Sequence, residues 1–387
     1  PYEYHASVSP LIKLLKKGHH GVELTDKEWQ TLYNWIDFNA PYHGKFKANV
    51  FKGVEQISRR TELTEKYAGS GVDWKAEIRS YADYLSKQEK PAAVKPERKE
   101  YKDKEVKLKG WPFDAATAKA MLSKETETQK SIELAPGIRM NFVRVPAGSF
   151  VMGSNRGHSD YSPVSKQVVK KAFWMGEIEV SNEQFRTIFP EHNSRFIGQL
   201  WKDHVHEGYP ANNPEQPAIR VSWQEAMDFC KKLSEKTGLN VTLPTEVQWE
   251  WACRAGSDDD FWYGSLNTDF AKFENLADVQ LNKAAVRGVN PQPMNPNDSW
   301  YKYYTYQPKE NGVDDGNMLM VKGGSYQANP WGLYDMQGNV AEWTRSDYMP
   351  YPYNEKAQDG TGTEKVARGG SWTEHPKTCT SYYRKAY

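Results

Sequence analysis

The chain of 387 residues has few cysteines, no long apolar run and almost no net charge. Its three cysteines, Cys230, Cys253 and Cys379, form no CxxC or CxxCH pattern, which argues against the common zinc and haem c motifs and allows at most one disulfide. No apolar stretch approaches the eighteen residues that indicate a transmembrane helix. The 51 basic and 50 acidic residues give a net charge of +1, so no nucleic-acid partner is expected.

Aliphatic side chains are also scarce, whereas aromatic residues make up 13% of the sequence. Large rings that supply much of the apolar mass are typical of a loop-rich fold. The length predicts about two or three domains. The chain begins Pro1-Tyr2 and not with an initiator Met or a signal peptide, so we expect it to be part of a longer protein.

The first 110 residues are expected to form a helical segment and a linker. Residues 1–85 would be the end of a larger upstream domain, with Leu11, Leu14 and Leu15 on one helix face. Thr25 and Glu28 have the spacing of a capping box for a second helix. Residues 86–110 are rich in lysine and arginine and poor in apolar side chains, which predicts a charged linker.

Residues 111–387 are expected to form a further domain. A short helix is expected over 115–123, strands before residue 146 and over 173–180, and a helix over 182–189. Ser222 and Thr245 are suitable N-caps for two further helices. Residues 256–332 are mostly turn-forming, and such a long loop in a compact domain is usually functional or organised by a cation.

The densest stretch of the sequence is residues 331–344, WGLYDMQGNVAEWT. Asp335 and Glu342 lie here among aromatic residues of the kind that proteins bury. Because an unpaired buried carboxylate is costly, each needs a partner, and a hard cation bound through oxygen is a natural one.

This stretch and four others, in the same order, resemble the formylglycine-generating enzyme (sulfatase-modifying factor) family over about residues 135–387. The other four are VPAGSF at 145–150, EVSN at 179–182, LPTE at 243–246 with WEWACR at 249–254, and RGGSW at 368–372. The resemblance implies an α+β domain with little regular secondary structure, related to the C-type lectin topology.

A second resemblance concerns the N-terminal segment, where 9–22 and 35–44 are similar to multidomain bacterial proteins related to the hydrazine synthase alpha subunit. Those relatives often carry haem c, but no CxxCH occurs here, so no haem site is inferred. The histidines of this segment could be surface residues or ligands for a part outside the sequence: His5, His19, His20 and His43.

The family resemblance implies two calcium sites. The first would use Asn275, Leu276, Asp315 and Asn317, with Asp314 as an alternative to its neighbour because the intervening loop is long. The second would use Asp335, Gly338, Val340 and Glu342, the middle two through backbone carbonyls. The alternative is that these acids bind backbone amides or arginines without a metal.

The resemblance also implies where an oxidase site would lie. Active members hold copper(I) between two cysteines that follow a Gly-Gly-Ser-aromatic motif, here Gly369-Gly370-Ser371-Trp372. In this chain Glu374 occupies the first cysteine position and Cys379 the second, and Ala341 replaces a tryptophan of the substrate channel. Copper(I) favours soft thiolate ligands, so copper is not expected, and the candidate catalytic residues Ser371, Glu374 and Cys379 are expected to be inactive.

The leading hypothesis is therefore a catalytically degenerate, calcium-stabilised binding or scaffolding module in an extracytoplasmic bacterial protein assembly. Its partners would be other proteins of that assembly, and its location is inferred from the resemblance alone. One alternative is an oxygen-dependent metal oxidase with an altered ligand set, in which Glu374, His375 and Cys379 converge. Another is a carbohydrate-binding module that uses the rings between Trp300 and Tyr306.

Overall fold

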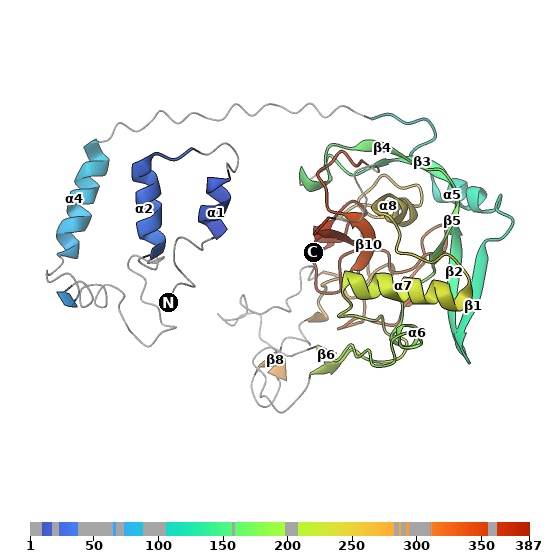
Figure 1. The fold of residues 1–387 in the computed structure, drawn as a ribbon. Helices are drawn as coiled ribbons and strands as arrows, with labels where there is room; N and C mark the ends of the chain where they lie inside the picture. The colour runs from blue at the N-terminus through green and yellow to red at the C-terminus, as the bar shows by residue number, and fades with distance from the viewer. Residues whose placement is uncertain are drawn as a thin grey trace. The chain divides into compact units, whose positions relative to one another are not determined.

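The structure is a computed structural model that describes residues 10–17, 23–37, 65–66, 73–87, 106–156, 159–197, 208–281, 286–287, 292–293, 310, 312–354 and 362–387. The chain divides into two compact units, Pro1–Glu100 and Tyr101–Tyr387 (Figure 1). No helix among the described residues is both long and apolar enough to cross a membrane.

Short elements dominate both units. The helices of the described residues are α1 (Pro10–Lys16), α2 (Asp26–Asp37), α4 (Trp74–Lys87), α5 (Ala115–Leu122), α6 (Asn182–Arg186), α7 (Trp223–Thr237) and α8 (Glu246–Arg254), with 3-10 turns η4 (Ser159–Tyr161) and η7 (Pro376–Thr378). The strands are β1 (Gln129–Ala135), β2 (Ile138–Val145), β3 (Gly148–Met152), β4 (Ser165–Val169), β5 (Phe173–Gly176), β6 (Phe196–Ile197), β7 (Tyr209–Pro210), β8 (Val286–Arg287), β9 (Gln292–Pro293), β10 (Glu342–Asp347), β11 (Lys365–Arg368) and β12 (Lys385–Ala386).

The N-terminal unit contains α1, α2 and α4. The capping box of α2 forms as expected, because the Thr25 N–H donates to Glu28 Oε2 at 2.8 Å. The expected apolar face of α1 is wrong: Ile12 is buried, whereas Leu11 and Leu14 are 42% and 43% exposed. Neighbouring helical residues point about 100° apart, so a helix that buries Ile12 turns Leu11 and Leu14 towards solvent. The four N-terminal histidines lie outside the described residues.

The C-terminal unit is built from small antiparallel sheets. One has the strand order β1-β2-β5, and another has the order β10-β11-β12. Along β2 the side chains of Met140, Val143 and Val145 are buried against the interior. The mixed architecture of small sheets and short helices confirms the predicted fold class.

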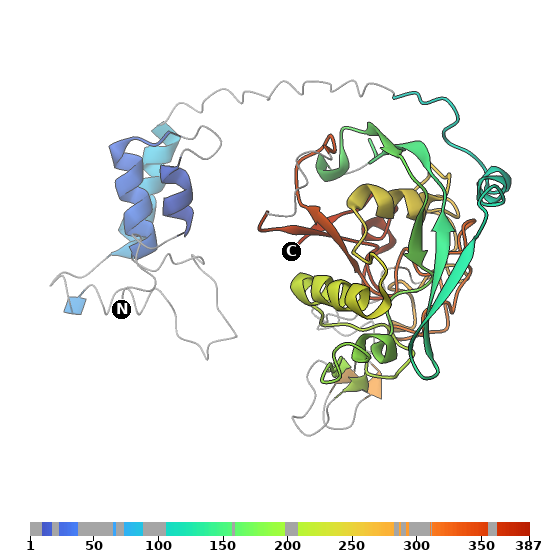
Figure 2. The ribbon, with the colours of Figure 1, turned by 45° about the vertical axis from the view of Figure 1, so that its right-hand side comes forward.

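Helices α7 and α8 begin where the sequence predicts. Ser222 and Thr245 form capping boxes with the residues three positions later, Glu225 and Gln248. Helix α7 is amphipathic, whereas all but one of the residues of α8 are buried. Helix α8 packs against β3, β4 and β10, and lies among the strands of the unit in both views (Figures 1 and 2).

The core around α8 contains charge as well as aromatic rings. Arg254 Nε lies 2.9 Å from Glu250 Oε1, and Arg384 Nε lies 2.8 Å from Glu246 Oε1. Arg368 contacts both glutamates, and all five side chains are at most 3% exposed. Burial alone would raise the pKa of Glu250, but the guanidinium groups of Arg254 and Arg368 lower it below its ordinary value.

The strand expected over 173–180 is shorter than predicted. Strand β5 ends at Gly176, and helix α6 ends at Arg186 rather than residue 189. After β5 the chain leaves the sheet, and the carboxylate of Glu179 accepts hydrogen bonds from Asn339 and Val340. The contacts of Glu179 with Asn339 and Val340 therefore replace the strand pairing that was expected over residues 177–180.

Candidate functional site

The loop of residues 331–344 is held in shape by an asparagine that precedes it. Asn329 Oδ1 accepts hydrogen bonds from the N–H groups of Trp331 at 3.0 Å and Leu333 at 3.2 Å. Its Nδ2 donates to a carbonyl oxygen of α8 at 2.8 Å. The start of this loop is thus fixed directly to helix α8.

Left-handed backbone conformations turn this loop inward. Asp335 and Asn339 have φ angles of 53° and 46°, values that Asp and Asn adopt more readily than most residues. Gly338 has a φ of 119°, and a Cβ atom there would lie 2.6 Å from the carbonyl oxygen of Asn275. The loop therefore packs closely against the segment that carries the first predicted calcium site.

The predicted second site contains two carboxylates, of which Asp335 is buried and Glu342 is half-buried. Asp335 Oδ2 accepts the Gly324 N–H at 2.6 Å, and Glu342 Oε2 accepts Trp249 Nε1 at 2.6 Å. Burial raises the pKa of Asp335 to about 6. Burial, with the charge of Asp335 adding to it, raises the pKa of Glu342 to about 7. Both groups therefore favour either a proton or a cation.

Glu179 is a third acid at this place, and the sequence analysis assigned it no role. Its Oε2 accepts Asn339 Nδ2 at 2.6 Å, and its Oε1 accepts the Val340 N–H at 2.9 Å. Burial and the nearby charges of Asp335 and Glu342 raise its pKa well above the ordinary value. Its position within the EVSN motif was the only signal that could have drawn attention to it.

Glu274 is a fourth acid, also without an assigned role, although it directly precedes Asn275. It accepts hydrogen bonds from Trp262 Nε1 at 3.2 Å and the Gln337 N–H at 3.3 Å. Burial and then the charge of Asp335 raise its pKa well above the ordinary value. Burial is the largest cause of the raised pKa of each of the four acids.

The residues of the predicted first site lie on two segments that the structure brings together. Asn275 Nδ2 donates to the Leu319 carbonyl oxygen at 2.8 Å. The backbone of Leu276 lies beside the Asp315 carboxylate, whose Oδ1 accepts the Asn317 N–H at 2.7 Å. Burial is the main cause that raises the pKa of Asp315 to about 7. The alternative ligand Asp314 is exposed.

Two buried carboxylate oxygens without a hydrogen-bond partner among the described residues fit a bound cation. Five buried side-chain polar atoms lack a hydrogen-bond partner in the part of the chain that the structure describes, and Asp315 Oδ2 and Asp335 Oδ1 are two of them. One therefore lies at each predicted site. Carboxylate and carbonyl oxygens are the ligands that calcium prefers. No group of three or more His, Cys, Asp and Glu side chains has a metal-binding arrangement among the described residues, so any cation here must also use carbonyl or amide oxygens.

The segment that carries Ser371, Glu374 and Cys379 is arranged differently. Cys379 is fully buried, and burial followed by the charge of Glu374 raises the pKa of its thiol. Glu374 Oε1 instead pairs with Lys385 Nζ at 3.2 Å. Ser371 Oγ lies 3.1 Å from Thr373 Oγ1. The acid that stands at the first cysteine position thus forms an ion pair.

The histidine of the altered ligand set also has contacts of its own. His375 Nε2 lies 3.6 Å from Glu310 Oε1, and its Nδ1 accepts the Lys377 N–H at 3.0 Å. Glu374 and His375 thus pair with different residues, and the three side chains Glu374, His375 and Cys379 form no metal cluster within the described ranges.

Comparison with known proteins shows which family this arrangement belongs to. Residues 128–387 match the family described as the sulfatase-modifying factor enzyme 1-like domain. The chain belongs to this family.

Two sequence relatives and one solved structure are similar to this chain. The chain is 24% identical over 287 residues to the formylglycine-generating enzyme of Mus musculus, covering 62% of this chain and 68% of that protein. It is 26% identical over 284 residues to the inactive C-alpha-formylglycine-generating enzyme 2 of Bos taurus, covering 63% and 80%. The structure of PvdO from Pseudomonas aeruginosa covers 68% of this chain and 94% of its own, at 22% identity and a TM-score of 0.49.

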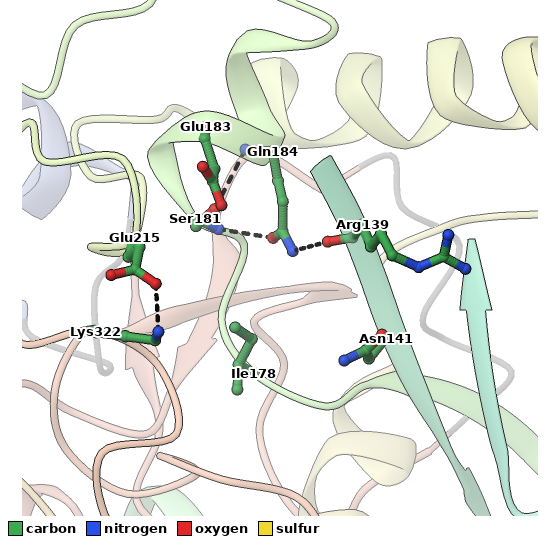
Figure 3. Close-up of a pocket in the computed structure, with 8 residues that line it drawn as sticks. All are labelled: Arg139, Asn141, Ile178, Ser181, Glu183, Gln184, Glu215 and Lys322. Atoms are coloured by element: carbon green, nitrogen blue, oxygen red, sulfur yellow. Dashed lines mark hydrogen bonds and ion pairs between the residues drawn. The ribbon is translucent and has the colours of Figure 1, made fainter. Parts of the chain in front are cut away.

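The family domain also has a small open pocket of about 130 Å³ between β2, the start of α6 and the loop around Lys322. Figure 3 shows Lys322 paired with Glu215 on one side of the pocket. Arg139 lies on the opposite side. Arg139 in turn lies 3.5 Å from Glu133. None of the predicted metal or catalytic residues lines this pocket, so it is separate from the sites described above.

Proposed function

We propose that this sulfatase-modifying factor domain is a calcium-stabilised binding or scaffolding module without formylglycine-generating oxidase activity. Its partners would be other proteins of an extracytoplasmic bacterial assembly. The observation that carries the proposal is the Glu374–Lys385 ion pair at the position where an active member needs a thiolate.

The side chains at the two cysteine positions of active members, Glu374 and Cys379, support the absence of a copper site. Copper(I) binds soft thiolates, and a carboxylate is a hard ligand that is here already paired with an ammonium group. The remaining thiol, Cys379, is fully buried and its pKa is raised, so it is held in the form that binds metals poorly. The inactive bovine relative is a precedent for a family member without the activity.

The buried acids support the calcium part of the proposal. The two orphaned oxygens of Asp315 and Asp335 would each gain a strong partner, and the family domain has few long helices or strands to supply stability otherwise. Calcium takes six to eight oxygens from carboxylates, carbonyls, amides and water. Its role in this domain is architectural, because it joins loops that regular hydrogen-bonded structure does not.

The first experiment is metal analysis of the purified protein for calcium, copper and iron, on wild type and on Cys379→Ala. About two calcium ions per chain, unchanged by the substitution, with no stoichiometric transition metal, is the expected result. A stoichiometric copper or iron that is lost with Cys379 would overturn the proposal in favour of an oxidase with an altered ligand set.

A direct activity assay complements the metal analysis. A cysteine peptide that the murine enzyme converts is incubated with this protein, copper(I) and oxygen, and the product is examined by mass spectrometry. We expect no loss of the thiol in the presence of this protein, while the murine enzyme converts the peptide in parallel.

The rings from Trp300 to Tyr306, on which the carbohydrate hypothesis depends, lie outside the described residues.

A further inference from the structure

A buried aspartate outside the predicted ligand set joins the two segments of the first site. Residues 275–281 run beside residues 313–319, where the Val279 N–H donates to the Val313 carbonyl oxygen at 3.2 Å. Asp278 lies at this crossing and is 0% exposed. A fully buried carboxylate requires a specific reason, because its desolvation is costly.

Both oxygens of the Asp278 carboxylate are used to hold backbone in place. Oδ1 accepts the Gln280 N–H at 2.8 Å, and Oδ2 accepts the Asp315 N–H at 2.5 Å on the opposite segment. Hydrogen bonds to an ionised group are short and strong. Asp278 therefore fixes the position of the Asp315 backbone within the loop.

The two carboxylate oxygens of Asp315 have different surroundings. Its Oδ1 accepts the Asn317 N–H, whereas Oδ2 is buried and has no hydrogen-bond partner among the described residues. With its backbone fixed from one side and Oδ1 from the other, the Asp315 carboxylate lies beside the Tyr326 hydroxyl and the Leu276 backbone, and its Oδ2 makes no hydrogen bond within the described residues. Within the described ranges neither Asp278 nor Asp315 has an ion pair with lysine or arginine.

We propose that Asp278 is a positioning residue of the first calcium site, which orients Asp315 and adds a second negative charge next to the ion. The inference rests on the proposed calcium role of the domain. The attraction between this charge and a bound cation grows in proportion to the charge of the cation. Asp278 therefore favours divalent and trivalent ions over monovalent ones.

Calorimetric titration tests the inference on three forms of the chelator-stripped protein: wild type, Asp278→Asn and Glu127→Gln. The last is a control, because it removes the same formal charge from an exposed residue outside both predicted sites. We expect Asp278→Asn to weaken one of the two calcium-binding steps by at least about tenfold. The other step and the control variant should change less than about threefold.

Titration with terbium separates a charge effect from a mere loss of structure. Because the electrostatic part scales with ion charge, a tenfold loss for Ca²⁺ predicts a loss of roughly thirtyfold for Tb³⁺. A purely structural defect would weaken both ions equally. Asp278→Glu keeps the charge but displaces the carboxylate, so it should weaken both ions by the same factor, and it serves the test if Asp278→Asn does not fold.

The possible failures are distinguishable. A wild-type protein that binds no calcium refutes the calcium module and this inference together. Calcium binding that Asp278→Asn leaves unchanged, or that Glu127→Gln weakens equally, refutes only the role of Asp278.

Discussion

Removal of calcium should make the stability of this domain fall as the pH rises, and calcium should abolish that fall. The pKa of Asp335 is raised from 3.8 to about 6, and that of Glu342 from 4.5 to about 7. In this pH range the folded state binds more protons than the unfolded state. Stability is therefore fully present below about pH 4 to 5 and is lost as the pH passes through 6 to 7.

The size of the effect follows from these two shifts. One pKa unit corresponds to about 1.4 kcal/mol, so each group costs on the order of 3 kcal/mol once it is ionised in the metal-free fold. For a domain of this size each kcal/mol changes Tm by about 2–4 °C. We expect the Tm of the metal-free protein to be roughly 10 °C or more lower at pH 8 than at pH 5.

Differential scanning calorimetry in chelator, from pH 5 to pH 8, measures this fall directly. Calcium at a thousandfold excess over its Kd should restore about 4 kcal/mol at pH 8. Asp335→Asn should remove about half of the pH dependence of the metal-free protein, because Glu342 still titrates, and should also lose most of the calcium effect. The exposed Glu127→Gln should change neither. Metal-free stability that rises between pH 5 and pH 8, or does not respond to calcium, would refute the reasoning.

Further predictions concern the buried core. Arg368→Met leaves Glu246 and Glu250 buried without the arginine that they share. The free energy of unfolding, measured by urea titration, should fall by about 3–5 kcal/mol. Adding Glu250→Gln should recover part of this loss. Gly370→Ala should lower the free energy of unfolding by at least about 1 kcal/mol, because Gly370 has a φ of +77° and the added Cβ would collide with the Cys379 sulfur. A stability equal to that of the wild type would contradict this expectation. The three buried thiols should react with a thiol reagent only in denaturant, and rapid reaction of the native protein would show that a thiol is accessible.

The sequence predicts local features of this fold well. The caps at Ser222 and Thr245 are correct because both partners of a capping box lie within three residues. The end of β5 is not predicted, because it depends on contacts between Glu179 and a loop about 160 residues later. Apolar periodicity contains no information about such a partner.

The same distinction applies to the candidate sites. The family motifs locate the two acidic loops, and the structure brings Leu276 and Asp315 into contact. Glu179, Glu274 and Asp278 are missed because a single acidic residue in a sequence carries no sign of its burial. Only the folded chain reveals that these three are among its least exposed carboxylates.

The charged core of the domain has a consequence for the order in which it folds. Glu246 and Glu250 on α8 are neutralised by Arg368 and Arg384, which follow more than a hundred residues later. During synthesis, a helix that emerges early must wait for these arginines before its acidic side can be enclosed. Contacts of such long sequence separation form slowly. The newly made domain therefore stays open, with its tryptophans accessible to chaperones or to wrong partners, until almost all of its residues are available.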